Sequence, residues 1–370
     1  MAKAVSRTEN EGAKTASVSS CSRKLRIISQ IMQNKSQITV MVLENFENTS
    51  MPPNDREPGV SFIVTSYNKA SYLPVVLESV WHEVAAAQGQ MILVDDGSTD
   101  GSLEICAAFA EAHPEVMFLY HENHGVFRTL NRVITAAEGE WVRFCDSDDP
   151  LIPGSTQRLI EAACTTGAPI AYGAAKPYGP LPLPEKLVVE PAVSRGKIGV
   201  HEDGAMYLLR RMGFTPSRAI YRRAPLMQAF PLPEHLVSCQ DLALSLAPAI
   251  GAPIAWVDEP MCFYLEGVEH QLSANRVLMW HQITRIVQHY AGRLSPRHQR
   301  AALVKACHRA SRFHRVRQKN LAALVRQVWL LSIIARAKLG LCNVPSMLDI
   351  IARSYEEELA PLLRGDRRVY

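Results

Sequence analysis

Residues 91–100 decide the fold, and they read Met-Ile-Leu-Val-Asp-Asp-Gly-Ser-Thr-Asp. The four consecutive apolar residues predict a short strand that is covered on both faces of a sheet. The acidic stretch with its glycine follows at once and predicts a tight turn at the end of that strand. In open parallel sheets, ligands bind beyond such strand ends.

Predicted strands and helices alternate on both sides of this stretch. The helix expected at 73–87, for example, carries apolar residues at spacings of three and four along one face. This alternation predicts parallel βαβ units with right-handed crossovers, and therefore an α/β protein with a mainly parallel central sheet. In this half of the chain we also expect strands at 60–65, 116–120 and 141–145 and helices at 102–112 and 127–137.

The composition is that of an ordinary globular protein. The chain has 370 residues, of which 47% are hydrophobic and 21% are charged. It contains no apolar run of the length that a spanning helix needs, and its beginning lacks the apolar core of a secretory signal. The eight cysteines are scattered without a Cys-x-x-Cys pair, which argues against a zinc site or a disulfide scaffold. We therefore expect a protein of the reducing cytoplasm.

Three regions are expected along the chain: a poorly ordered tail at 1–58, an α/β domain at 59–275 and a basic helical module at 276–370. The first 25 residues lack a hydrophobic period, residues 25–46 are more apolar and could form a short helix or strand, and translation is expected to start near Met51. Residues 276–340 hold 14 Lys and Arg but no Asp or Glu. A positive face of this kind attracts anionic lipid, nucleic acid or an acidic partner; the alternative is a solvated helical face.

A second acidic cluster follows the strand expected at 141–145, and it reads Asp146-Ser147-Asp148-Asp149-Pro150. Three carboxylates so close together repel one another unless a cation lies among them. Oxygen ligands suit Mg²⁺ or Mn²⁺, which bind one or two carboxylates together with substrate phosphates. A solvated acidic turn is the alternative here, and a simple helix N-cap is the alternative for residues 95–100.

Four motifs taken together resemble the family 2 glycosyltransferases of the GT-A fold, which is Rossmann-like. They occur in the family's order at typical intervals: Thr65-Ser66-Tyr67-Asn68, residues 95–100, Asn123-His124-Gly125 with Asn131, and residues 146–149. The resemblance is strong over residues 59–160 and weaker to about 275. It covers neither the N-terminal tail nor the basic module.

The resemblance implies a nucleotide site and a metal site. It implies that Thr65 and Tyr67 line the pocket for the base, and that Asp96 hydrogen-bonds the base with Asp95 beside it. Asp146 would contact the ribose or sugar, and Arg128 would face the donor unless it is a surface helix residue. Asp148 would be the main protein ligand of Mn²⁺ or Mg²⁺ bridging the diphosphate. His270, if it is not purely structural, would complete the metal or diphosphate site.

The resemblance also implies a general base, at Asp241 in the segment Cys239-Gln240-Asp241. This carboxylate would take the proton from the acceptor hydroxyl as that oxygen attacks the anomeric carbon. One base and no covalent nucleophile imply inversion at that carbon. Gln240 departs from the family, where Glu is frequent, and the alternative role for Asp241 is a helix cap.

The sequence therefore predicts a metal-dependent inverting glycosyltransferase. The donor would be a nucleotide-diphosphate sugar, commonly UDP-linked in this family, and the acceptor a hydroxyl of a saccharide or lipid-linked intermediate in cell-surface polysaccharide or glycolipid synthesis. The alternatives are a catalytically inactive nucleotide-sugar-binding or scaffold protein, a glycoside hydrolase, and a nucleotidyltransferase. A nucleotidyltransferase usually carries a Gly-rich signature where this chain has residues 66–69, and a hydrolase needs no base pocket.

The basic module is expected to meet an anionic membrane surface through residues 276–340, at the inner face of the membrane. Within it, residues 321–335 combine apolar side chains with Arg326, a pattern that suits a lipid interface. Nucleic acid is not expected as a partner, because aromatic residues do not interleave with the charges. The alternative is a helical bundle that packs on the α/β domain or on a second subunit.

Overall fold

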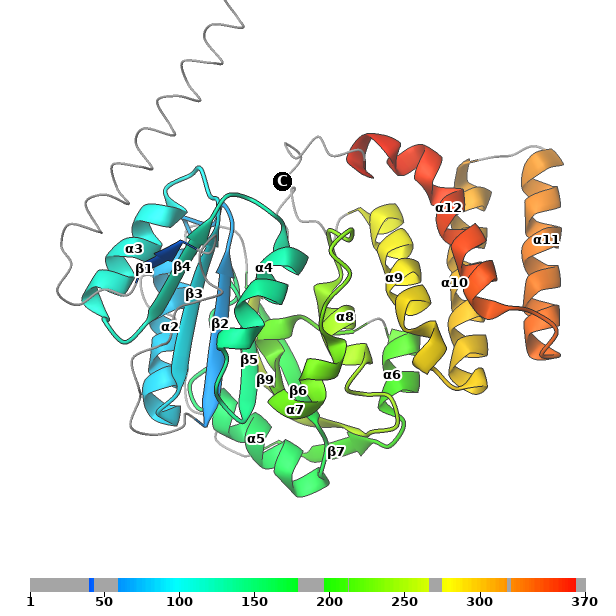
Figure 1. The fold of residues 1–370 in the computed structure, drawn as a ribbon. Coiled ribbons are helices and arrows are strands. Elements are labelled where there is room, and N and C mark those ends of the chain that lie inside the picture. Colours follow the sequence, from blue (N-terminus) through cyan, green and yellow to red (C-terminus); the bar gives the residue numbers. More distant parts are fainter. Residues whose placement is uncertain are drawn as a thin grey trace, which may run out of the picture.

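The computed structural model (Figure 1) describes residues 40–42, 59–178, 196–211, 213–265, 275–317 and 321–363. Apart from residues 40–42, the predicted tail lies outside the described residues. His270 also lies outside them. The described part consists of an α/β body and a group of C-terminal helices that stand beside it.

One sheet of nine strands runs through the body in the order β1-β4-β3-β2-β5-β8-β6-β9-β7. The strands from β1 to β5 pair in parallel, whereas β8 pairs antiparallel with both β5 and β6. The predicted α/β class with a mainly parallel sheet is therefore confirmed. The bounds are β1 Val40–Val42, β2 Val60–Ser66, β3 Gln90–Asp96, β4 Met117–His121, β5 Trp141–Asp146, β6 Ile170–Tyr178, β7 Ile198–His201, β8 Ala219–Arg222 and β9 Ile254–Leu265.

Helices cover both faces of this sheet. One buried cluster joins the sheet to α2, α3 and α5, and a second joins it to α4, α6, α8 and the C-terminal helices. Because the strands are covered on both sides, their apolar runs need no alternation. The bounds are α2 Leu73–Ala87, α3 Ser102–Ala112, α4 Val126–Val133, α5 Ser155–Thr166, α6 Gly204–Arg211, α7 Arg223–Leu226 and α8 Gln240–Leu246. The helix predicted at 127–137 is shorter than expected, since a 3₁₀ turn at Ile134–Ala136 follows α4.

The neighbouring strands β3, β2 and β5 end at the same edge of the sheet. In their registers Ser66 lies opposite Asp95, and Thr65 lies opposite Asp146. The sheet therefore brings the motif at 65–68 and the two acidic clusters together, although up to 80 residues of chain separate them.

A buried arginine holds β5 to another strand of the sheet and to the adjoining helices. Arg143 of β5 is 0% exposed and lies beside Glu83 of α2, with 3.5 Å between Nη1 and Oε2. Its guanidinium also donates to Thr156 Oγ1 at 2.5 Å and to the carbonyl oxygens of Ser217 and Met261 at 3.0 and 3.1 Å. Arg143 thus ties β5 to two helices, to the turn at 216–218 and to β9.

Within the described residues, the C-terminal module contains four α-helices: α9 Arg276–Tyr290, α10 Pro296–Arg317, α11 Leu321–Lys338 and α12 Val344–Leu363. The module shares its core with the body. Tyr290 Oη, for instance, donates to the carbonyl oxygens of Ala229 and Ala243 at 2.9 and 3.3 Å. In the part of the chain that the structure describes, no helix is both long and apolar enough to cross a membrane.

Candidate active site

The loop after β2 is bound to the loop after β3. Asn68 has a left-handed backbone (φ 52°), and its N–H donates to Ser98 Oγ at 3.0 Å while its Oδ1 accepts from the N–H of Thr99 at 2.8 Å. The N–H of Lys69 donates to Ser102 Oγ at 2.8 Å. These bonds make the motifs at 65–68 and 95–100 one unit. The predicted nucleotide residues Thr65 and Tyr67 are half-buried.

The two aspartates that end β3 are both buried, Asp95 completely and Asp96 to within 5% exposure. Asp95 Oδ1 accepts from the N–H of Ser98 at 2.9 Å. Asp96 Oδ1 accepts from the N–H of His124 at 2.8 Å, and Oδ2 accepts from the N–H of Gly125 at 3.0 Å. Burial raises the pKa of Asp96 despite these bonds. The structure therefore places Asp96 as the residue that holds the loop before α4, whereas its contact with a base remains a prediction.

The second acidic cluster is compact and carries a partner that the sequence did not reveal. Lys69 Nζ lies 2.5 Å from Asp148 Oδ2. Burial opposes the charge of Lys69, but the carboxylates of Asp148 and Asp146 raise its pKa overall. Lys69 follows directly on the motif at 65–68, and this place in the chain was the only signal that could have identified it.

Burial and neighbouring carboxylates raise the pKa of two members of the cluster, Asp146 and Asp149. Burial, followed by the charges of Asp148 and Asp241, raises the pKa of Asp146 to about 7. Burial, followed by the charges of Asp146 and Asp148, holds the pKa of Asp149, which is 2% exposed, well above its usual range. Tyr178 Oη donates to the carbonyl oxygen of Asp148. The cluster is thus short of positive charge even with Lys69 in place.

Asp241 lies in the first turn of α8 and faces this cluster. The helix begins after Cys239, which has a left-handed backbone (φ 65°), and burial raises the pKa of Asp241 to about 7. Gly213 lies directly against its carboxylate, because a Cβ at that position would lie 2.6 Å from Oδ2. Asp146 ends β5 and Asp241 lies in the first turn of α8, so the structure brings into electrostatic contact two residues that are far apart in the chain.

The donor set fits a cation that is held mainly by its substrate. Among the described side chains, no group of three or more His, Cys, Asp or Glu could hold a metal ion alone. Mg²⁺ and Mn²⁺, however, commonly bind one or two carboxylates and take their remaining ligands from phosphates and water. Asp148 offers one such carboxylate at the edge of the sheet, and the raised pKa of Asp146 indicates a surplus of negative charge.

Arg128 lies on α4 at the surface, with a side chain that is 43% exposed. Its Nε is 3.1 Å from Glu234 Oε2. One turn further along α4, Asn131 Nδ2 donates to the carbonyl oxygen of Leu232 and its Oδ1 accepts from the N–H of Leu232. Both residues therefore hold the segment at 232–234, and a contact of Arg128 with a donor remains a prediction.

A cavity of about 290 Å³ opens beside the acidic cluster. Thr215 and Arg218 line one wall, and Tyr264 of β9 lines another. Ser217 lies between Thr215 and Arg218 in the chain, and its Oγ accepts from the N–H of Asp146 at 2.9 Å. No sequence pattern marked this cavity, because its walls come from three separate segments. Its position beside Asp146 suits a second substrate.

Comparisons with known proteins agree with this geometry. The family model described as Glycosyl transferase family 2 matches residues 61–230. The uncharacterized glycosyltransferase alr2836 of Nostoc is 27% identical over 222 residues, which are 58% of this chain and 67% of that protein. The succinoglycan biosynthesis protein ExoO of Rhizobium meliloti is 33% identical over 120 residues, which are 32% of this chain. The chain spans only 30% to 34% of the length of three of its curated relatives, ExoO among them.

Solved structures share the fold. TarS 1-349 of S. aureus in complex with UDP-GlcNAc has a TM-score of 0.55 and 19% identity, and the match covers 84% of this chain and 87% of that chain. A second crystal structure of TarS 1-349 has a TM-score of 0.53. At this level of identity the likeness establishes the fold alone.

Proposed function

Residues 61–230 match the family model of glycosyl transferase family 2, and on this basis we propose that the chain moves a sugar from a nucleotide-diphosphate donor to an acceptor hydroxyl. The resemblance predicted from the motifs is thereby confirmed at the level of the family. The observation that carries the proposed reaction is the meeting of Asp146, Asp148 and Asp241 at one edge of the sheet.

Asp241 is the general base in this proposal. A carboxylate with a pKa of about 7 is half ionised near neutral pH and is a far better proton acceptor than an ordinary aspartate. It takes the proton of the acceptor hydroxyl while the oxygen attacks the anomeric carbon and the bond to the diphosphate breaks. A single attack of this kind inverts the anomeric centre, through a transition state with oxocarbenium character.

The other residues bind and orient the donor. Thr65 and Tyr67 line the base pocket, Asp96 hydrogen-bonds the base with Asp95 beside it, and Asp146 contacts the ribose or sugar. Asp148 would hold Mn²⁺ or Mg²⁺, and such an ion would supply positive charge to neutralise the leaving diphosphate. Lys69, 2.5 Å from Asp148, adds a positive charge at the same place.

The donor and the acceptor are proposed from chemistry and from the relatives. The structural neighbour TarS was solved with UDP-GlcNAc, so a UDP-sugar is the first donor to test. The relative ExoO is named for succinoglycan biosynthesis, which supports a saccharide acceptor in surface polysaccharide synthesis. The cavity beside Thr215 and Arg218 offers such an acceptor a place next to Asp146.

The basic module is proposed to contact an anionic membrane. On α11, four apolar side chains are 40% to 63% exposed, and they are Val325, Val328, Trp329 and Leu331. Apolar side chains beside basic ones are typical of helices that lie in a lipid interface. Such a contact would keep the enzyme near a lipid-linked acceptor.

Calorimetric titration of UDP, GDP, dTDP and CDP with and without Mn²⁺ tests the donor site. We expect one nucleotide to bind only with the metal, and this binding to be lost in Asp148→Ala. Asp258→Ala is the matched control, because Asp258 is an exposed residue of β9 outside the cluster. If no nucleotide binds under any condition, the chain is an inactive scaffold and the proposed reaction is wrong.

A further inference from the structure

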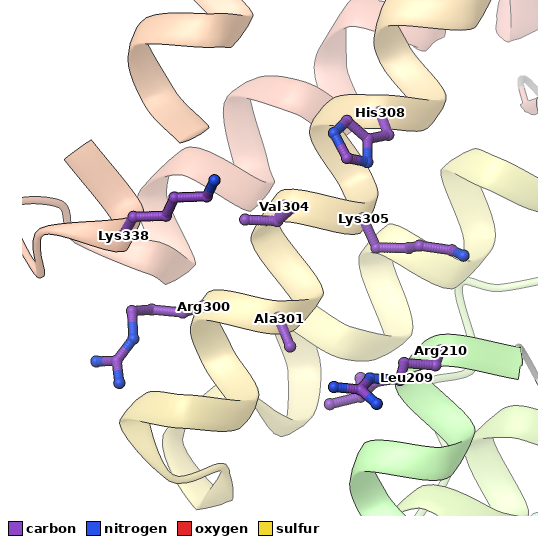
Figure 2. A pocket seen from close by; sticks show the side chains of 8 residues that line it. All are labelled: Leu209, Arg210, Arg300, Ala301, Val304, Lys305, His308 and Lys338. Atoms are coloured by element: carbon purple, nitrogen blue, oxygen red, sulfur yellow. The ribbon is translucent and has the colours of Figure 1, made fainter. Parts of the chain in front are cut away.

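A second cavity lies between α6, α10 and the end of α11, and none of the residues that line it belongs to the acidic cluster. Its volume is about 440 Å³. Figure 2 shows side chains from these three helices around it, and four of them are cationic: Arg210, Arg300, Lys305 and Lys338. We call this site the cationic pocket. None of its lining residues is acidic.

The positive charge of the cationic pocket is not balanced by the protein. Other cations of the module have acidic partners; Arg285, for example, lies 2.6 Å from Asp349, and Arg353 lies 2.8 Å from it. Within the described residues, the four cations of the pocket form no ion pair with Asp or Glu. Burial and the charges of neighbouring arginines lower the pKa of Lys305. An anionic ligand would relieve this repulsion.

Apolar side chains also line the cationic pocket. Ala301 and Val304 of α10 lie between the charged side chains in Figure 2. Directly after Lys338, Leu339 is 72% exposed and Leu341 is 63% exposed. A small inorganic anion would leave these apolar surfaces in water, whereas an anion attached to a hydrocarbon chain would cover them.

We propose that the cationic pocket binds the phosphate group of an anionic lipid while Leu339, Leu341 and the exposed face of α11 enter the lipid interface. Lysine and arginine form short, charge-assisted hydrogen bonds with phosphate oxygens. Cations from three helices surround this phosphate in the pocket. Because the three helices hold the phosphate together, the pocket also fixes the orientation of the module on the membrane. The inference rests on the membrane contact proposed above and gives it a defined site.

The test uses the full chain and vesicles, and it measures binding instead of sugar transfer. Vesicles of phosphatidylcholine alone are compared with vesicles that also contain phosphatidylglycerol, by flotation and by titration. The test variant is Arg300→Ala/Lys305→Ala. The matched control is Arg312→Ala/Arg336→Ala, which removes two exposed cations of the same helices that do not line the pocket.

We expect the wild type to bind only the vesicles with phosphatidylglycerol. The pocket cations contact the lipid phosphate in this proposal and the control cations do not, so at about fivefold in affinity for each cation the pocket variant should bind about 25-fold more weakly. The control should lose clearly less, and nucleotide binding should be unchanged in both variants, which shows that they are folded.

Three results would overturn the proposal in distinguishable ways. Equal losses in the two double variants would mean that overall charge, and not the pocket, attracts the membrane. Absence of binding by the wild type would refute the membrane contact together with the pocket. If titrated inorganic phosphate binds the wild type and not the pocket variant, while both bind vesicles equally, a free phosphate and not a lipid is the ligand. None of these results bears on the donor site, which the nucleotide titration tests separately.

Discussion

Gly213 lies so close to Asp241 that a Cβ at position 213 would be 2.6 Å from Oδ2 of that aspartate. The backbone of Gly213 is also left-handed, with φ 90°, a conformation that residues with a side chain rarely adopt. The glycine therefore allows the carboxylate to occupy its place at the start of α8. Any side chain here must move either the loop or the proposed base.

We predict that Gly213→Ala lowers kcat by about 10- to 100-fold, because a displacement of about 1 Å is enough to misplace a catalytic group. Nucleotide binding should change little, since the donor site lies on other loops. Gly251→Ala is the matched control. Gly251 is also left-handed (φ 76°), but nothing lies within 4 Å of its Cβ position. Equal losses in both variants would mean that backbone strain, and not contact with Asp241, causes the effect.

The pH dependence of the reaction should report the ionisation of Asp241. The base must be deprotonated to accept a proton, and its pKa is raised to about 7 by burial. Below this value the rate should fall about tenfold for each pH unit, and above it the rate should level off. A profile of kcat/KM between pH 5 and 9 checks this. Asp241→Asn should lower the rate about 10²- to 10⁴-fold and remove the dependence; a profile that stays flat in the wild type would exclude Asp241 as the base.

The same burial predicts that the proposed base costs stability. The pKa of Asp241 is about 7 in the folded protein and lies near 3.8 in an unfolded chain. Between these values the folded state holds the proton more tightly, so stability is lost as the pH rises from about 4 to about 7. Asp241→Asn does not titrate, and we expect it to raise the Tm at pH 8 and to raise it less at pH 5. Thermal unfolding at the two pH values measures this, and a lower Tm at pH 8 would contradict it.

The first half of the fold was predictable because its elements are encoded locally. Predicted and observed helices coincide at 73–87 and 102–112, and the predicted strands differ from β2 to β5 by no more than two residues at each end. The antiparallel insertion of β8 between β5 and β6 had no such signal. It is a strand of four residues, Ala219–Arg222, and its place depends on contacts with distant strands.

The candidate site was predictable only where its residues belong to a local motif. The acidic motifs mark the ends of strands, and the parallel sheet brings strand ends together whatever the intervening sequence. Lys69 acts through Asp148, 79 residues away, and Gly213 acts through Asp241, 28 residues away. A single residue with a distant partner produces no pattern in the sequence.

Removing Lys69 should strengthen the binding of a divalent cation. Its ammonium lies 2.5 Å from Asp148 Oδ2, so in the absence of substrate it competes with a metal for this carboxylate. We expect Lys69→Ala to bind Mn²⁺ more tightly than the wild type in a titration without nucleotide. Lys197→Ala, which removes an exposed lysine, serves as the control. Weaker Mn²⁺ binding in Lys69→Ala would mean that the lysine supports the metal instead of competing with it.

The buried pair of Arg143 and Glu83 should dominate the stability of the body. Arg143 is 0% exposed and Glu83 is 3% exposed, so loss of the arginine leaves a buried carboxylate without its counter-charge. We expect Arg143→Met to lower the free energy of unfolding by about 3–5 kcal/mol, measured by urea denaturation. The Glu83 carboxylate also accepts from the backbone N–H groups of Gly154 and Thr156 at 2.6 and 2.8 Å, and a glutamine can keep only part of these bonds. Arg143→Met/Glu83→Gln should therefore regain some stability but not all of it, and a double variant less stable than Arg143→Met would show that Glu83 acts mainly as a cap of α5 and not as the partner of the arginine.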